Sequence, residues 1–231
     1  MVDLAAAYAS CVRDARTHYE NFPVASRLVP RHMRHHVAAV YAFARAADDF
    51  ADEGTCPVED RHRLLDGWLC RLRDAVSREP DVPSRPIGVG EPANTHEIFI
   101  ALGATIRDKQ LPPGLFEDLL SAFRQDVTVT RYASWMDVMD YCRRSANPVG
   151  RLVLRIAGYR DATLDAWSDR ICTALQLTNF WQDLKIDFDR GRVYLPEDEM
   201  RAHGASPSEL ASSKMTPFSP SSYAMKSPLG Q

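Results

Sequence analysis

Two groups of oxygen-bearing side chains are the strongest candidates for chemistry in this sequence. Asp48 and Asp52 are four residues apart in the acidic run Asp-Asp-Phe-Ala-Asp-Glu. Asn179, Asp183 and Asp187 follow one another at the same interval. Residues four apart project from one face of a helix, so each group would present its oxygen atoms on one side.

The donor chemistry of the two groups indicates a metal and a phosphate. Ligand sets made only of oxygen favour hard cations, and Mg²⁺ is usually held by a few carboxylates together with waters and substrate phosphates. An acidic run is more often a solvated helix surface. Here, however, Asp48 directly follows the apolar stretch 37–47, and Asp183 closely follows Phe180 and Trp181. Two such faces directed at each other would clamp a polyphosphate.

Helices must position these groups, because apolar residues recur every three or four positions along most of the chain. One stripe, from Val37 to Ala47, predicts a helix over residues 32–53, and another, from Leu115 to Phe123, predicts a helix after Pro113. Further apolar positions of this kind are Met136, Met139, Val149 and Val153. Alternating, strand-like runs are nearly absent. The sequence therefore predicts an all-α protein of about seven helices.

Composition excludes several classes of protein. The chain has 231 residues, 45% of them hydrophobic and 26% charged, with a net charge of −3, which is typical of a globular protein and gives no general attraction to nucleic acid. Its five cysteines form no C-x-x-C pair, so neither a disulfide framework nor a zinc site is expected. No apolar stretch is long enough to span a membrane. We expect a cytoplasmic protein with reduced thiols.

The last 26 residues differ from the rest. Residues 206–231 are rich in Ser and Pro and show no helical period. Such a segment buries too little apolar surface to offset its chain entropy. We therefore predict one domain over residues 1–205, followed by a disordered or aberrant tail over residues 206–231.

The motifs resemble those of the squalene and phytoene synthases, a family that joins prenyl diphosphates head to head. The stretch 41–52, Tyr-Ala-Phe-Ala-Arg-Ala-Ala-Asp-Asp-Phe-Ala-Asp, resembles the first aspartate-rich helix of the family. The stretch 176–187 resembles the second, and 190–196 is similar to the flap over the diphosphate. The resemblance covers about residues 18–196. It implies an isoprenoid-synthase helical bundle with a central apolar cavity, whose C-terminal helices are missing here.

The resemblance also implies a role for each matched residue. The ligands of two or three Mg²⁺ ions would be Asp48, Asp52, Asn179, Asp183 and Asp187. The contacts to diphosphate or substrate would be His18, Phe22, Arg45, Gln176, Gln182, Arg192 and Tyr194. The residues near the reacting carbons would be Tyr41 and Tyr141, to which we add Asn147 as a hypothesis explained below. The sequence has no nicotinamide fingerprint, so no NAD(P)H is expected.

Two departures from the common family pattern indicate a branch of the family. Gln182 stands where many members have an arginine, and Asn147 begins Asn-Pro-Val-Gly where many have Ala-Gly before Val-Gly. Together with residues 20–26, these variants resemble the hydroxysqualene synthases of bacterial hopanoid biosynthesis. Those enzymes release diphosphate from presqualene diphosphate and capture the cation with water. As a hypothesis, the Asn147 amide holds that water.

Other functions remain open. A squalene, dehydrosqualene or phytoene synthase would instead condense two prenyl diphosphates. A protein of another class would keep the fold and act as an assembly factor or prenyl-lipid binder, and a third possibility is an inactive truncated product. The expected partner is a prenyl diphosphate and not nucleic acid. Loose peripheral association with a membrane and contact with other hopanoid enzymes are further expectations.

Overall fold

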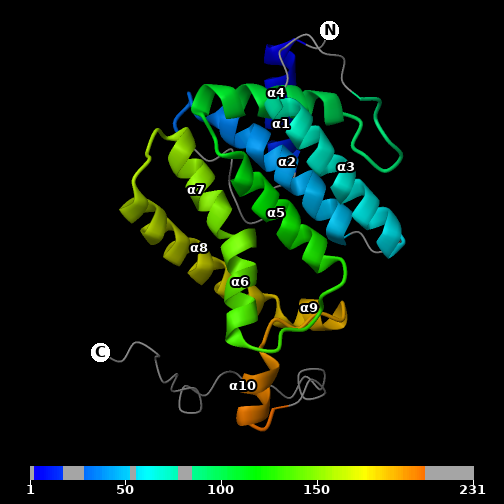
Figure 1. Ribbon diagram of the computed structural model, residues 1–231, viewed down its shortest axis with the longest axis vertical. Coiled ribbons are helices and arrows are strands. Elements are labelled where there is room, and N and C mark those ends of the chain that lie inside the picture. The colour runs from blue at the N-terminus through cyan, green and yellow to red at the C-terminus, as the bar shows by residue number, and fades with distance from the viewer. Residues whose placement is uncertain (1–2, 18–28, 53–55, 78–84, 206–231) are drawn as a thin grey trace. The chain divides into compact units, whose positions relative to one another are not determined.

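The computed structural model describes residues 3–17, 29–52, 56–77 and 85–205, and helices joined by loops make up this part of the chain (Figure 1). The helices are α1 (Leu4–Thr17), α2 (Arg34–Asp52), α3 (Val58–Ser77), α4 (Thr95–Lys109), α5 (Pro113–Asp126), α6 (Trp135–Ser145), α7 (Asn147–Ile156), α8 (Ala162–Gln182), α9 (Leu184–Asp189) and α10 (Glu197–Ala202). The predicted all-α class is confirmed. The described residues form more helices than predicted, partly because α9 and α10 have six residues each and are too short to show a repeating apolar stripe, and partly because the segment around Pro148 forms two helices, α6 and α7.

The structure bears on the expected absence of a membrane span but not on the predicted tail. None of them combines the length and the apolar character that a membrane crossing requires. The predicted tail, 206–231, lies outside the described residues, as does the segment 18–28. Among the described residues, β pairing is limited to an isolated parallel bridge between Arg131 and Val193.

The chain divides into two compact units, which we describe separately. The first comprises Met1–Val129 and Met139–Leu177, and the second comprises Thr130–Val138 and Thr178–Gln231. Because the boundaries fall inside α6 and α8, each of these helices contributes residues to both units.

Helix α2 is central to the first unit, where it packs against α1, α3, α4, α5 and α7. Small side chains let so many helices approach one helix closely. The buried alanines of α2 are Ala38, Ala39, Ala42, Ala46, Ala47 and Ala51. Since alanine also has the highest helix propensity, this composition favours both a straight α2 and its burial.

Aromatic side chains fill the space between α2 and its neighbours. Trp68 of α3 is fully buried and donates a hydrogen bond from Nε1 to the carbonyl oxygen of Phe43, at 3.2 Å. Phe43 meets Phe116 of α5 edge to face, with ring centroids 5.5 Å apart, and Trp68 meets Phe99 of α4 at 4.6 Å. Truncating one such ring to alanine typically costs about 3–5 kcal/mol. This core holds α2 in place.

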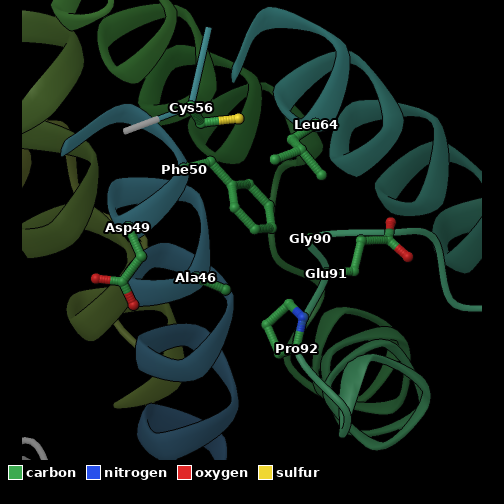
Figure 2. Close-up of a pocket in the computed structure, with 8 residues that line it drawn as sticks. All are labelled: Ala46, Asp49, Phe50, Cys56, Leu64, Gly90, Glu91 and Pro92. Atoms are coloured by element: carbon green, nitrogen blue, oxygen red, sulfur yellow. The ribbon is translucent and has the colours of Figure 1, made fainter. Parts of the chain in front are cut away.

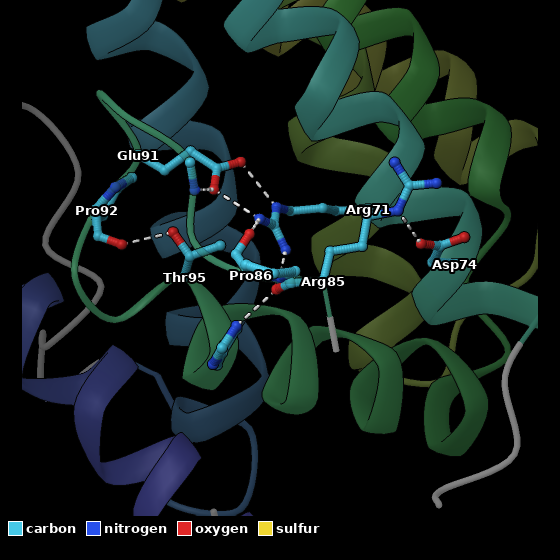
Figure 3. A network of polar contacts seen from close by, with 9 residues as sticks. Arg71, Asp74, Arg85, Pro86, Glu91, Pro92 and Thr95 are labelled. Carbon is cyan, nitrogen blue, oxygen red and sulfur yellow. Dashed lines mark hydrogen bonds and ion pairs between the residues drawn. The ribbon is translucent and has the colours of Figure 1, made fainter. Parts of the chain in front are cut away.

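A buried ion pair attaches the loop before α4 to α3 (Figure 3). Arg71 donates to both carboxylate oxygens of Glu91, at 2.8 and 2.6 Å, and to the carbonyl oxygens of Arg85 and Pro86. Burial raises the pKa of Glu91, but the hydrogen bonds from Arg71 and from the Gly88 amide outweigh it, so the pKa is lowered. The loop is therefore fixed by charge-assisted bonds.

One predicted set of core positions is wrong. Met136 is 82% exposed and Met139 is 45% exposed, whereas the buried positions of α6 are Val138, Tyr141 and Cys142. The true stripe is shifted by two residues from the methionines. Because both sets keep a helical spacing, the periodicity alone does not distinguish them.

Helices α7 and α8 approach closely in the first unit. A Cβ atom at Gly150 would overlap the side chains of Ser168 and Cys172, so only glycine allows this approach. Two ion pairs lie along the same contact: Arg151 bonds Asp169 and Arg155 bonds Asp165, each at 2.5 Å.

Candidate active site

The face of α2 that turns away from the core carries four of the predicted site residues. Tyr41, Arg45 and Asp48 are half-buried and Asp52 is exposed, while the positions between them are mostly buried. Intervals of four, three and four residues match the helical repeat. The two carboxylates therefore lie on one face of an uninterrupted helix.

Arg45 partly neutralises this acidic face. Its guanidinium lies 2.7 Å from Asp49 and 3.8 Å from Asp48. Burial by itself would lower the pKa of Arg45, but the negative charges of Asp49 and Asp48 raise it above its ordinary value. Asp49 therefore holds the Arg45 guanidinium among the carboxylates of this face, with Asp48 as its second, more distant partner.

The second oxygen-bearing face differs from the expected single helix. Helix α8 ends at Gln182 and α9 begins at Leu184, so the predicted continuous helix is interrupted at Asp183. Asp183 has φ −95° and ψ 7°, a conformation that aspartate, a poor helix former, adopts readily.

Hydrogen bonds nevertheless keep the four-residue spacing through the break. The Asp183 amide donates to the Asn179 carbonyl at 2.9 Å, and the Asp187 amide donates to the Asp183 carbonyl at 2.8 Å. All three side chains are half-buried, whereas Gln182 between them is exposed. Gln176, one turn earlier on α8, is half-buried too.

The segment after α9 folds back on this face within the second unit. Gly191 adopts φ +84°, which favours glycine, and the Arg192 amide donates to the Asp187 carbonyl at 2.8 Å. Tyr194 stacks on Phe180 of α8, with ring centroids 3.8 Å apart and planes 5° apart. These contacts fix Arg192 and Tyr194 beside the helix that carries Asn179.

The two other predicted catalytic residues belong to the first unit. Tyr141 of α6 is 5% exposed, and its hydroxyl donates to Asp126 at 2.7 Å. Asn147, the first residue of α7, is buried and accepts a hydrogen bond from the Thr173 hydroxyl at 3.0 Å. Both polar groups are thus held in place. His18 and Phe22 lie outside the described residues.

The donor set fits Mg²⁺. Each motif supplies carboxylates one helical turn apart, with only an amide added in the second motif, and this is the hard-oxygen chemistry that Mg²⁺ prefers. Within the described parts of the chain, no group of three or more His, Cys, Asp or Glu side chains is close enough to hold a metal. Such an ion would therefore bind only weakly to the protein alone, and substrate oxygens would complete its coordination, as is usual for Mg²⁺.

A separate pocket of about 400 Å³ lies elsewhere in the first unit (Figure 2). Its walls come from α2, from α3 and the residues just before it, and from the loop before α4. The lining residues are Ala46, Asp49, Phe50, Cys56, Leu64, Gly90, Glu91 and Pro92. None of the predicted site residues lines it. The pocket therefore adjoins the acidic helix without containing its metal-ligand candidates.

Three partners of the site residues were not predicted: Asp126, Tyr132 and Thr173. Tyr132 stacks with Tyr194 at 5.7 Å. Asp126 had a recognisable signal, because it lies four residues after Ala122 and seven after Leu119, on the apolar stripe of α5. An acid at a core position indicates a specific partner. Thr173 and Tyr132 had no comparable signal.

The family follows from these features and from comparison with known proteins. A model of the squalene/phytoene synthase family matches residues 15–225, so the chain belongs to that family. Among curated relatives, the hydroxysqualene synthase of Sinorhizobium fredii is 41% identical over 87% of this chain and 63% of its own length. A phytoene synthase of Mycobacterium tuberculosis is 30% identical over 87% of this chain and 61% of its own length.

Solved structures agree with this family. The crystal structure of squalene synthase HpnC from Alicyclobacillus acidocaldarius matches with a TM-score of 0.77 and 40% identity, over 91% of this chain and 73% of that one. A dehydrosqualene synthase complex matches with a TM-score of 0.74 and 25% identity. The chain spans 59–66% of the length of the three hydroxysqualene synthases it matches.

Proposed function

We propose that this chain converts presqualene diphosphate and water to hydroxysqualene and diphosphate, with Mg²⁺. The carrying observation is identity: three relatives named hydroxysqualene synthase are 39–41% identical, whereas the matching mycobacterial phytoene synthase is 30% identical. The oxygen-bearing faces of α2 and of α8–α9 supply oxygen ligands for the Mg²⁺ that a diphosphate substrate needs.

In this proposal, Asp48, Asp52, Asn179, Asp183 and Asp187 hold the metal. Bound Mg²⁺ supplies neutralisation of the charge that develops on the diphosphate as it leaves. Arg45 and Arg192 contribute charge-assisted hydrogen bonds to diphosphate oxygens, for which a guanidinium is well suited. The rings of Tyr41 and Tyr141 attract the positive charge that forms on carbon, by about 0.5–2 kcal/mol each.

Asn147 is the candidate for positioning the attacking water. Its oxygen accepts from Thr173, which orients the amide so that its NH₂ group is directed elsewhere. Replacing Asn147 with alanine removes that donor and is expected to lower the ratio of hydroxysqualene to hydrocarbon products. An unchanged ratio in Asn147→Ala would exclude this role.

Substrate choice tests the proposed function. The purified chain is incubated with Mg²⁺ and either presqualene diphosphate or farnesyl diphosphate, and products are identified by mass spectrometry. Hydroxysqualene from presqualene diphosphate alone is the expected result. It should be lost in Asp48→Asn and Asp183→Asn and retained in Asp60→Asn, which removes a carboxylate that pairs with Arg63 on the surface of α3.

Other outcomes would assign a different function. Products from farnesyl or geranylgeranyl diphosphate alone would indicate a squalene, dehydrosqualene or phytoene synthase. Binding of a prenyl diphosphate by a folded chain without turnover would indicate a prenyl-lipid binder.

We also propose that the protein collects its substrate at a membrane surface, because substrate and product are poorly soluble in water. Trp167, Ile171 and Leu175 lie four residues apart on α8 and are each more than half exposed. Flotation with liposomes, compared between the wild type and Ile171→Ser, measures this association. Contact with other hopanoid enzymes stays a prediction.

A further inference from the structure

Asp126 is an unusual residue in the core of the first unit. It is 7% exposed, and it differs from Glu91, the acidic side chain of the buried ion pair described above, in that the hydrogen bond described for it comes from a neutral phenol and not from an arginine. It lies at the end of α5, on the stripe that otherwise buries Phe116, Leu119 and Ala122. Burying a carboxylate costs free energy unless strong hydrogen bonds compensate. Packing alone would be better served by an apolar residue at this position.

The Asp126 carboxylate has a specific partner of chemical interest. It accepts a hydrogen bond from the Tyr141 hydroxyl at 2.7 Å, and both side chains are buried. The two residues are fifteen positions apart in the sequence. A phenol that donates to a carboxylate keeps its oxygen lone pairs available to accept another proton. The pair therefore has the hydrogen-bonded geometry of a two-step proton relay, in which a proton accepted by Tyr141 is balanced by the one that Tyr141 passes to Asp126.

We propose that Asp126 is the positioning residue and final proton acceptor of a relay through Tyr141 that completes water capture. This inference rests on the proposed function. In the step, a water lone pair forms the C–O bond to the carbocation, and one O–H bond of that water breaks. Its electrons stay on the new alcohol oxygen, its proton passes to the Tyr141 oxygen, and the Tyr141 proton passes to Asp126. The positive charge on carbon and the negative charge on Asp126 are both neutralised.

Carbocation chemistry explains why the proton should reach the Asp126 carboxylate through a tyrosine rather than directly. A carboxylate in direct contact with a carbocation would form an ester and inactivate the enzyme. A protonated alcohol, in turn, loses water readily and regenerates the cation, so prompt removal of the proton makes capture irreversible. Without the relay, more of the cation loses a proton from carbon and becomes hydrocarbon.

The test separates diphosphate release from product partition. Asp126→Asn and Tyr141→Phe are each assayed with presqualene diphosphate for diphosphate release and for the ratio of hydroxysqualene to hydrocarbon. We expect that ratio to fall by about tenfold or more in both variants, with a much smaller fall in diphosphate release, because general-base assistance typically contributes about 10²–10⁴-fold and partial capture without it would reduce the loss. The double variant should resemble either single variant, since both remove the same relay. A structural role would instead lower diphosphate release and leave the product ratio unchanged, and that result would overturn the proposal.

Two controls make the result decisive. Asp140→Asn makes the same substitution one residue before Tyr141, at an exposed carboxylate that pairs with Arg143 and Arg144, and should leave the ratio unchanged. In protein with ¹³C-labelled tyrosine, the chemical shift of the Tyr141 ring carbon that bears the hydroxyl should change in Asp126→Asn and be unchanged in Asp140→Asn. A resonance that does not move would overturn the relay. If Asp126→Asn does not fold, Tyr141→Phe decides, because it deletes only the hydroxyl.

The relay and the proposed function fail in different ways. A wild-type chain that makes no hydroxysqualene overturns the proposed function. A wild-type chain that makes hydroxysqualene, with an unchanged product ratio in both variants, overturns the relay alone.

Discussion

The two oxygen-bearing faces of this protein are built differently. Asp48 and Asp52 lie on the uninterrupted α2, which is packed on several sides by the aromatic core and carries its own cation, Arg45. Asn179, Asp183 and Asp187 run through a helix break, and their local structure depends on the turn that follows.

The difference shows two ways to hold carboxylates at one spacing. On α2, burial of the opposite helix face keeps the backbone straight and Arg45 reduces repulsion between the acids. At the end of α8, backbone hydrogen bonds through Asp183 and the stack of Tyr194 on Phe180 keep the geometry. We therefore expect the first face to be insensitive to changes in neighbouring loops and the second to be sensitive.

The largest expected effect tests whether both faces are needed equally. Asp48→Asn and Asp183→Asn should each lower diphosphate release by roughly 10²–10³-fold, the order of loss seen when one group that stabilises developing charge is removed. Phosphate-coupled detection of diphosphate measures this. Asp60→Asn is the matched control. A large loss in only one variant would show that one face works without the other.

The next effect concerns the pH dependence of stability, through His36, a buried histidine of α2. Burial lowers the pKa of His36 to about 4, helped by His35 and Lys109 and opposed by Asp108. Its ordinary pKa is 6.5, so the unfolded chain binds a proton between these values and the folded chain does not. Stability should therefore fall as the pH drops from about 6.5 to about 4, by on the order of 3 kcal/mol.

Urea unfolding at pH 7.5 and pH 5 checks this prediction. The drop should shrink in His36→Gln and persist in His203→Gln, which changes a half-exposed histidine directly after α10. An equal drop in the wild type and in His36→Gln would show that other groups cause it.

A smaller effect should be confined to the second face. Tyr194→Ala removes the ring that stacks on Phe180 and Tyr132, which should cost about 1–3 kcal/mol in local stability, from lost aromatic contacts and buried area. Hydrogen exchange should quicken at the Val193 amide, which bonds Thr130 at 2.9 Å, and stay unchanged in α2.

Tyr159→Ala is the control for that experiment, because Tyr159 is more than half exposed in the first unit. Quicker exchange along α2 in Tyr194→Ala would contradict the contrast between the two faces.

The smallest effect concerns the cation of the first face. Arg45→Met removes the positive charge beside Asp48 and Asp49, so titration calorimetry should show Mg²⁺ binding a few-fold more tightly in the absence of substrate. Lys185→Met removes a cation from the exposed pair with Asp189 near the second face. It should change Mg²⁺ affinity less, since exposed pairs are screened by solvent. A larger effect in Lys185→Met would reverse the comparison.

The sequence by itself determined the helical class, the family motifs and the shared face of Asp48 and Asp52. Those features depend on local spacing, because the helical repeat alone decides which residues share a face. It also contained the signal for Asp126, an acid on an apolar stripe, although the partner of that acid was not predictable.

Only the tertiary structure decided which groups from distant segments meet. The hydrogen bond from Tyr141 to Asp126, the bond from Thr173 to Asn147 and the stack of Tyr194 on Phe180 each join separate elements. The buried stripe of α6 was misjudged for a related reason, because two stripes of equal helical spacing differ only in what packs against them, and packing is set by the rest of the chain. The break at Asp183 was missed because a four-residue spacing is the same whether the helix continues or is interrupted for one residue.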